Sequence, residues 1–135
     1  MDLLAFGKSV LASQPLSILL GCTLNSFETG KAQLELIIDD KHKQQHGFVH
    51  GGVLSYLADN ALTFAGGSIL GDSVTSEFKI NYTRPAIGEK LLVEASVVAA
   101  GRRQAVCDCK VYAVTAEQKK LVAVAQGTIA KAGAG

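Results

Sequence analysis

The chain has 135 residues, 48% of them hydrophobic, which is enough for one domain with a single core. Its 13 basic and 12 acidic residues leave a formal charge of +1, so no bulk field favours nucleic acid or an anionic membrane. Three cysteines without metal-type spacing, no basic leader and no apolar stretch of membrane-spanning length together predict a cytoplasmic protein.

The first third of the chain predicts a short helix, a hairpin and a polar loop. Apolar residues near helical spacing predict a helix within residues 1–14, which Pro15 closes. Residues 17–26 have strand character, and the alternating segment from Lys31 predicts a second strand that pairs with them. Residues 39–50 are polar and contain glycine, which indicates a loop leading into the next helix.

One long helix and a run of strands follow. Apolar residues recur at helical spacing from Val53 to Ala65, so we expect a central helix over residues 51–66 with Gly66 and Gly67 as its stop. Four segments with strand character come next, at 74–83, 90–100, 103–115 and 120–131, and their short links imply antiparallel neighbours. This order predicts an α+β domain with the helix packed on one face of an antiparallel sheet.

The predicted central helix carries a polar stripe. Ser55, Asp59 and Thr63 are spaced i, i+4, i+8, so they share one face of an otherwise apolar helix. A buried carboxylate is costly unless it is paired or used in a cleft. The stripe therefore either faces solvent, as in most amphipathic helices, or marks a site.

The start of the same helix has open backbone amides. In His50-Gly51-Gly52 the first-turn amides lack helical partners, and the positive end of the helix dipole lies behind them. Such amides can stabilise an oxyanion, a large term in acyl-transfer catalysis. A tight loop or close helix packing explains the glycine pair equally well.

The spacing of these two features has a geometric consequence. Gly51 and Asp59 are eight residues apart, so one helix separates them by about 12 Å. If both act on one thioester, each must lie within about 3 Å of its reacting atom. A second subunit must then bring its Asp59 to Gly51, and a twofold axis would create two equivalent sites.

Two segments carry a resemblance to a known family. Residues 50–61, HGGVLSYLADNA, closely resemble the HGG-x6-D helix signature of PaaI-like hotdog-fold acyl-CoA thioesterases, and residues 75–89 are similar to the strand-to-turn segment that follows it. With the flanking strands, the resemblance covers about residues 15–131. It implies a single hotdog domain over residues 1–135, an antiparallel sheet wrapped around the central helix, and hydrolysis of acyl-CoA without a cofactor or metal. It also implies a homodimer at least, with a homotetramer favoured.

The resemblance implies a role for each matching residue. Asp59 would act as nucleophile or as general base on water, and the choice stays open. The Gly51 amide would polarise the thioester carbonyl, His50 would orient the loop or bind near the thioester, and Thr75 would help to place the attacking water. Gln44 aligns with a loop position at which relatives often have Asn.

The substrate's CoA phosphates and acyl group suggest further candidates. Arg84, Arg102 and Arg103 could bind the phosphates, although exposed arginines at turns are usually only solvated. An apolar acyl pocket is expected near the helix start, and its possible walls are Phe48, Tyr56 and Phe64. Neither an aromatic nor an aliphatic acyl group is favoured by the sequence.

A metal site and a catalytic cysteine fit the sequence less well. His42, His46 and His50 repeat every four residues, but their segment is polar and interrupted by glycine, so a metal site is not favoured. Cys107 and Cys109 fall in an apolar strand and are expected to be packing residues.

Two other functions on the same fold stay open. An acyl-CoA hydratase or dehydratase could pair His50 with Asp59. A non-catalytic acyl-CoA-binding protein would usually need a partner domain, for which 135 residues leave no space.

Overall fold

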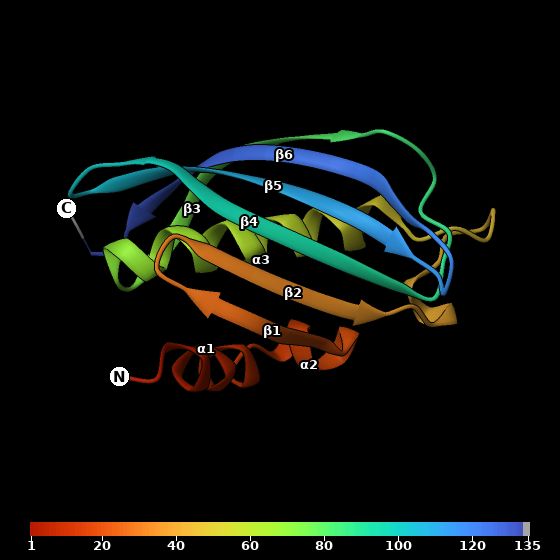
Figure 1. The fold of residues 1–135 in the computed structure, drawn as a ribbon, viewed down its shortest axis with the longest axis horizontal. Coiled ribbons are helices and arrows are strands. Elements are labelled where there is room, and N and C mark those ends of the chain that lie inside the picture. The colour runs from red at the N-terminus through yellow and green to blue at the C-terminus, as the bar shows by residue number, and fades with distance from the viewer. Residues whose placement is uncertain (134–135) are drawn as a thin grey trace.

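The computed structural model describes residues 1–133; residues 134 and 135, the end of the expected domain, lie outside the described part. A six-stranded antiparallel sheet curves around one long helix, α3, while two short helices lie beside β1 at one edge (Figure 1). The helices are α1 (Leu3–Ala12), α2 (Pro15–Leu20) and α3 (Gly51–Leu70), with a 3-10 turn η1 (Asp40–His42). The strands are β1 (Cys22–Glu28), β2 (Lys31–Ile37), β3 (Ser73–Tyr82), β4 (Lys90–Ala100), β5 (Gln104–Val114) and β6 (Lys119–Lys131).

The sheet order is β1-β2-β4-β5-β6-β3, and every neighbouring pair is antiparallel. Strands β4, β5 and β6 lie in the middle and cover the apolar face of α3, whose Leu57, Ala61 and Leu62 are fully buried. Burying that face against the inner side of the sheet provides the main hydrophobic stabilisation of the domain. The α+β hotdog prediction is confirmed.

The strand predicted over residues 17–26 is wrong in its first half. Residues 15–20 form α2, which has Pro15 in its first turn and ends at Gly21 with a left-handed φ of 87°. Proline is favourable at a helix start and glycine at its end, so this short apolar run is helical although it is also compatible with a strand. The strand begins at Cys22 and forms the expected hairpin with β2.

The central helix does not end at residue 66, as expected from its two glycines, but continues to Leu70. Gly66 serves close packing instead, because a Cβ there would lie 2.7 Å from Ile129 Cβ on β6. The helix ends at Gly71, which has a φ of 86°. None of the helices formed by residues 1–133 has the length and apolar character needed to span a bilayer.

Candidate active site

The start of α3 presents one free backbone amide. His50 is the N-cap, and its Nδ1 accepts the Gly52 N–H at 2.7 Å, so in a neutral ring the proton is on Nε2. Among residues 1–133 the Gly51 N–H has no acceptor. Because it also lies at the positive end of a 20-residue helix, the Gly51 amide is suited to binding a negatively charged oxygen.

Asp59 lies two turns further along α3, on a half-buried face. One of its carboxylate oxygens accepts a hydrogen bond from the Thr75 hydroxyl of β3. The Thr63 hydroxyl lies 2.8 Å from both the Asp59 carbonyl oxygen and Thr75 Oγ1. The two threonines therefore hold the carboxylate in one orientation, while its half-buried position leaves it accessible from outside the core.

The polar stripe that the sequence predicts is thus connected to β3. Ser55 also contacts that strand, because its hydroxyl lies 2.6 Å from the Tyr82 hydroxyl. The structure brings Thr75 to Asp59, but His50 and Gly51 stay at the helix start, about 12 Å away along the unbroken helix. One subunit alone does not bring the amide and the carboxylate to a common atom.

Tyr82 is a site residue that the sequence analysis missed. Its hydroxyl donates to the Gly51 carbonyl oxygen at 3.2 Å, and its ring lies 3.4 Å from the position of a Gly51 Cβ. Together with the His50 bond to the Gly52 N–H, this fixes the Gly51–Gly52 peptide at both ends. No local signal in the sequence marks Tyr82, because the contact depends on the end of β3 lying beside the start of α3.

Gln44 organises the loop that leads to the helix. Its side-chain oxygen accepts the His46 N–H, and its backbone N–H donates to the Phe48 carbonyl oxygen at 2.9 Å. Its side-chain NH₂ has no partner among residues 1–133, so it remains available to a ligand or to solvent.

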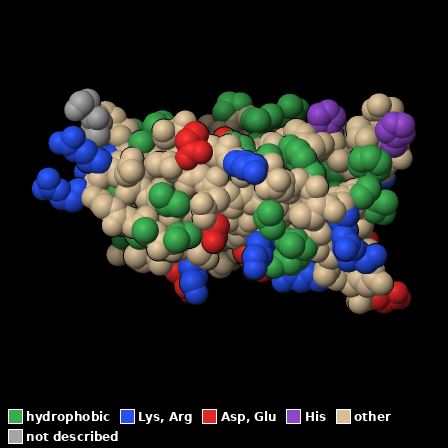
Figure 2. All heavy atoms as spheres, turned by 90° about the horizontal axis from the view of Figure 1, so that it is seen from above, with side chains coloured by type: hydrophobic (Ala, Val, Ile, Leu, Met, Phe, Trp, Pro, Cys, Tyr) green, Lys and Arg blue, Asp and Glu red, His purple; other side chains and the backbone are tan. Residues whose placement is uncertain are grey.

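The three candidate arginines lie at opposite ends of the molecule. Arg84 comes two residues after Tyr82, which contacts Gly51, so Arg84 lies at the same end of the molecule as the start of α3. The backbone carbonyl oxygen of Arg103 accepts the Lys131 N–H at 2.9 Å, and Lys131 pairs with Ser73, which lies next to Gly67 near the end of α3. In Figure 2 the histidines lie towards one end, while Lys and Arg side chains are spread along the face and occur at both ends.

Within one subunit, Arg102 and Arg103 are therefore remote from the Gly51 amide. Gly51 and Gly67 are 16 residues apart, or about 24 Å along the helix. The three arginines do not form one phosphate-binding group in a single chain.

The buried histidine and cysteines have structural contacts. Both ring nitrogens of His42 are engaged, Nδ1 by the Asp39 N–H at 2.9 Å and Nε2 by the Leu20 carbonyl oxygen at 2.7 Å. Burial raises the pKa of Cys107 to about 11 and that of Cys109 to about 12, which disfavours the reactive thiolate. The interpretation of these two cysteines as packing residues is confirmed by their burial.

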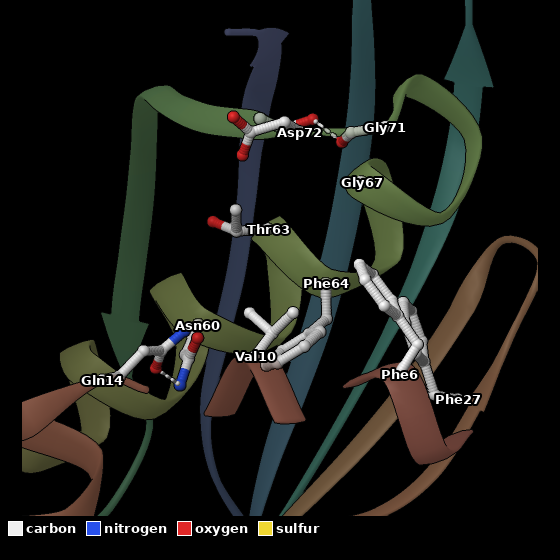
Figure 3. Close-up of a pocket in the computed structure, with 11 residues that line it drawn as sticks. Phe6, Val10, Gln14, Phe27, Asn60, Thr63, Phe64, Gly67, Gly71 and Asp72 are labelled. Carbon is white, nitrogen blue, oxygen red and sulfur yellow. Dashed lines mark hydrogen bonds between the residues drawn. The ribbon is translucent and has the colours of Figure 1, made fainter. Parts of the chain in front are cut away.

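A cavity of about 430 Å³ opens between α1 and α3. Figure 3 shows three phenylalanines on one side, with Gln14 and Asn60 together on the other. Of the three aromatic walls expected from the sequence, only Phe64 lines this cavity. Phe48 stacks on His46 instead, and the Tyr56 hydroxyl donates to Ser17 Oγ at 2.5 Å.

Comparison with known proteins identifies the family. A family model described as "Thioesterase superfamily" matches residues 46–119, which include α3 and the strands β3, β4 and β5. This chain belongs to the thioesterase superfamily. A thioesterase family protein from Silicibacter pomeroyi has the same fold with a TM-score of 0.88 and 31% identity, over 92% of this chain and 93% of that one.

Two further relatives have more specific names. The PaaI protein of E. coli, from the phenylacetic acid degradation operon, is 25% identical, with a TM-score of 0.84 over 96% of each chain. A 1,4-dihydroxy-2-naphthoyl-CoA hydrolase from Listeria monocytogenes is 33% identical over 114 residues, which are 82% of this chain and 90% of the relative. The resemblance to PaaI-like thioesterases is confirmed, and this superfamily member is a thioester hydrolase.

Proposed function

We propose that this chain hydrolyses acyl-CoA thioesters to a free acid and CoA, using Asp59 of one subunit and the Gly51 amide of another. The observation that carries the proposal is the arrangement on α3. A carboxylate oriented by Thr75 and a free amide lie on the same helix, two turns apart. Acyl transfer needs both a base or nucleophile and a donor to the oxyanion.

A twofold pairing of subunits would complete the site. Strand β3 forms one edge of the described sheet, and its Val74 and Tyr82 are 56% and 51% exposed. An open edge with exposed apolar side chains favours pairing with a second copy. Because β3 also carries Thr75 and contacts Gly51 through Tyr82, such pairing would bring two helix starts and two carboxylates together. We propose a homodimer at least, with a homotetramer favoured.

The reaction can follow either of two routes at this site. Asp59 takes a proton from water, which then attacks the thioester carbon, or the carboxylate attacks directly and water hydrolyses the resulting anhydride. In both routes the Gly51 N–H stabilises the oxyanion, the C–S bond breaks and CoA leaves as the thiol. Thr75 orients Asp59 and the attacking water, while His50 and Gln44 shape the loop beside the carbonyl.

The dimer also bears on CoA binding. In the proposed pairing the partner's Asp59 lies at Gly51, so the end of the partner's helix near residue 67 lies about 12 Å from Gly51 instead of about 24 Å. Arg84 of one subunit with the partner's Arg102 and the partner's Arg103 could then bind phosphates along an extended CoA.

The names of the relatives favour an aromatic acyl-CoA as substrate, since one is a naphthoyl-CoA hydrolase and another belongs to a phenylacetic acid operon.

We propose that residues 1–135 form one hotdog domain. Three buried free thiols fit a reducing compartment, so we propose a cytoplasmic location.

The test is thiol release from a panel of aryl and aliphatic acyl-CoA esters by wild type, Asp59→Ala and Asp108→Ala. Asp108 is a matched control, because it is an exposed carboxylate on β5. We expect Asp59→Ala to lose at least about 100-fold in turnover at unchanged oligomeric state, and Asp108→Ala to match wild type. An Asp59→Ala variant as active as wild type would refute the mechanism, and no hydrolysis of any ester would refute the substrate class.

A further inference from the structure

Two adjacent glycines give the start of α3 conformational freedom. His50, before them, is anchored through its backbone, because its N–H donates to the His42 carbonyl oxygen at 2.8 Å and its carbonyl oxygen accepts the Val53 N–H at 2.9 Å. Gly51 and Gly52 have no side chains that could restrict the peptide between them. The direction of the Gly51 N–H therefore depends on contacts that other residues make with that peptide.

A chain of hydrogen bonds supplies those contacts. The Tyr82 hydroxyl donates to the Gly51 carbonyl oxygen at 3.2 Å. The N–H of the same peptide, from Gly52, donates to His50 Nδ1 at 2.7 Å. Ser55 extends the chain in the other direction, because its Oγ lies 2.6 Å from the Tyr82 hydroxyl oxygen. Since the Tyr82 proton is directed to the carbonyl, the Ser55 hydroxyl is the donor in that contact.

Each bond of this chain strengthens the next one. Donation to a peptide carbonyl oxygen makes the N–H of the same peptide a better donor, so His50 Nδ1 is held as an acceptor. The proton of the neutral His50 ring then stays on Nε2. Among residues 1–133 neither His50 Nε2 nor the Gly51 N–H has a hydrogen-bond partner. Two unpaired donors therefore lie on adjacent residues at the positive end of α3.

We propose that Tyr82 and Ser55 are positioning residues for hydrolysis, which direct the Gly51 amide towards the oxyanion and keep His50 in the tautomer with its proton on Nε2. The inference rests on the proposed function. Neither side chain has to contact the substrate, because both act through the Gly51–Gly52 peptide. Donors that are oriented in advance stabilise the charge of the transition state more than the bound ester. Loss of either hydroxyl is therefore expected to lower kcat with little effect on KM.

The Tyr82 hydroxyl is tested by steady-state kinetics of Tyr82→Phe on phenylacetyl-CoA, with the other esters of the panel in parallel. Phenylalanine keeps the ring that lies 3.4 Å from the position of a Gly51 Cβ and removes only the hydroxyl. We expect kcat to fall by about tenfold and KM to change by less than about twofold. Tyr112→Phe is the matched control and should match wild type, because the Tyr112 ring contacts Lys119 while its hydroxyl makes no hydrogen bond within residues 1–133.

Other kinetic results would overturn the positioning role. A Tyr82→Phe variant with wild-type kcat would show that the hydroxyl is not needed. A raised KM at unchanged kcat would mean that Tyr82 binds the substrate directly. A fall in kcat that accompanies dissociation of the oligomer in size-exclusion chromatography would assign Tyr82 to the subunit interface alone.

A double-mutant cycle tests whether Ser55 acts through Tyr82. Ser55→Ala alone is expected to lower kcat by about threefold, whereas Ser55→Thr, which keeps a hydroxyl, should retain most of the activity. Adding Ser55→Ala to Tyr82→Phe should cause no further loss, because the serine hydroxyl then has no phenol oxygen to hold. Losses that multiply in the double variant would overturn the connection between the two residues.

The tautomer of His50 gives a test that needs no substrate. NMR spectra that correlate ring protons with ring nitrogens distinguish a protonated nitrogen from an unprotonated one, at about pH 8.5 where an ordinary imidazole is neutral. The His50 signals are those that His50→Gln removes. We expect an unprotonated Nδ1 in wild type and, in Tyr82→Phe, a shift of both nitrogens towards the average of the two tautomers.

The spectra and the kinetics separate this inference from the proposed function. Ring-nitrogen signals that Tyr82→Phe leaves unchanged would overturn the role of Tyr82 in holding the His50 tautomer, even in an active thioesterase. A wild type that releases no thiol from any ester of the panel would instead refute the proposed function, while the spectra would still decide whether the hydrogen-bond chain controls His50.

Discussion

Asp59 owes its orientation to a residue from another element. Thr75 of β3 donates to the carboxylate, and Thr63 of the same helix lies against both residues. A hydroxyl that donates to a carboxylate stabilises its charged form and restricts its rotation. The proposed catalytic geometry therefore depends on how β3 is docked on α3 as well as on the helix itself.

Removal of the Thr75 hydroxyl is expected to lower turnover more than substrate affinity. A hydrogen bond to a charged group is worth about 1.5–3 kcal/mol, so Thr75→Val should reduce kcat by roughly 10- to 150-fold, while Thr75→Ser keeps most of it. Steady-state kinetics measure kcat and KM separately. Thr128→Val is the matched control, because Thr128 donates to the exposed Glu77 carboxylate at 2.7 Å. A Thr75→Val enzyme with wild-type kcat would contradict the orienting role.

Within the elements, glycines have roles that the local sequence does not distinguish. Gly66 and Gly67 look like a helix stop, but only the distant Ile129 explains why a glycine is needed at position 66. The candidate site likewise has some features that the local sequence predicts and others that depend on distant contacts. The polar stripe and the open helix start follow from periodicity, while the Asp59–Thr75 contact and the separation of Arg84 from Arg103 depend on strand order, which residue spacing does not determine.

The two adjacent glycines should respond oppositely to alanine. At Gly66 a Cβ would lie 2.7 Å from Ile129 Cβ, so Gly66→Ala should lower the free energy of unfolding by about 1–3 kcal/mol. At Gly67 the nearest atom is Ser73 Oγ at 3.8 Å, so Gly67→Ala should be neutral or stabilise by up to about 1 kcal/mol. Urea unfolding of both variants measures the difference, and equal effects would show that helix packing on β6 is not tight at Gly66.

At the scale of the whole molecule, burial keeps several ionisable groups neutral. Desolvation raises the pKa of Cys22 and Cys107 to about 11, of Cys109 to about 12 and of Tyr56 to about 12. In the unfolded chain these groups lose protons at lower pH than in the folded chain. The unfolded state is therefore favoured as pH rises above about 9, where its thiols ionise first.

These groups should leave the free energy of unfolding unchanged up to about pH 8 and lower it as pH rises from about 9, where the unfolded thiols ionise, to about 12, where the folded groups ionise. Urea unfolding at a series of pH values in the presence of a reductant measures this slope. Cys109→Ala should give a shallower fall than wild type, because it removes one of the groups with a raised pKa. A slope that the alanine variant leaves unchanged would mean that other groups cause the alkaline loss.

The position of β6 in the sheet also affects how the chain is made. This strand comes last in the sequence, yet it lies between β5 and β3. On the ribosome, β3 is complete roughly 40 residues before β6 begins, a delay of about 2–8 s at ordinary rates of synthesis. Throughout that time part of α3 is uncovered and β3 has no neighbour to pair with, so a nascent chain stalled before residue 119 is a natural substrate for chaperones and proteases.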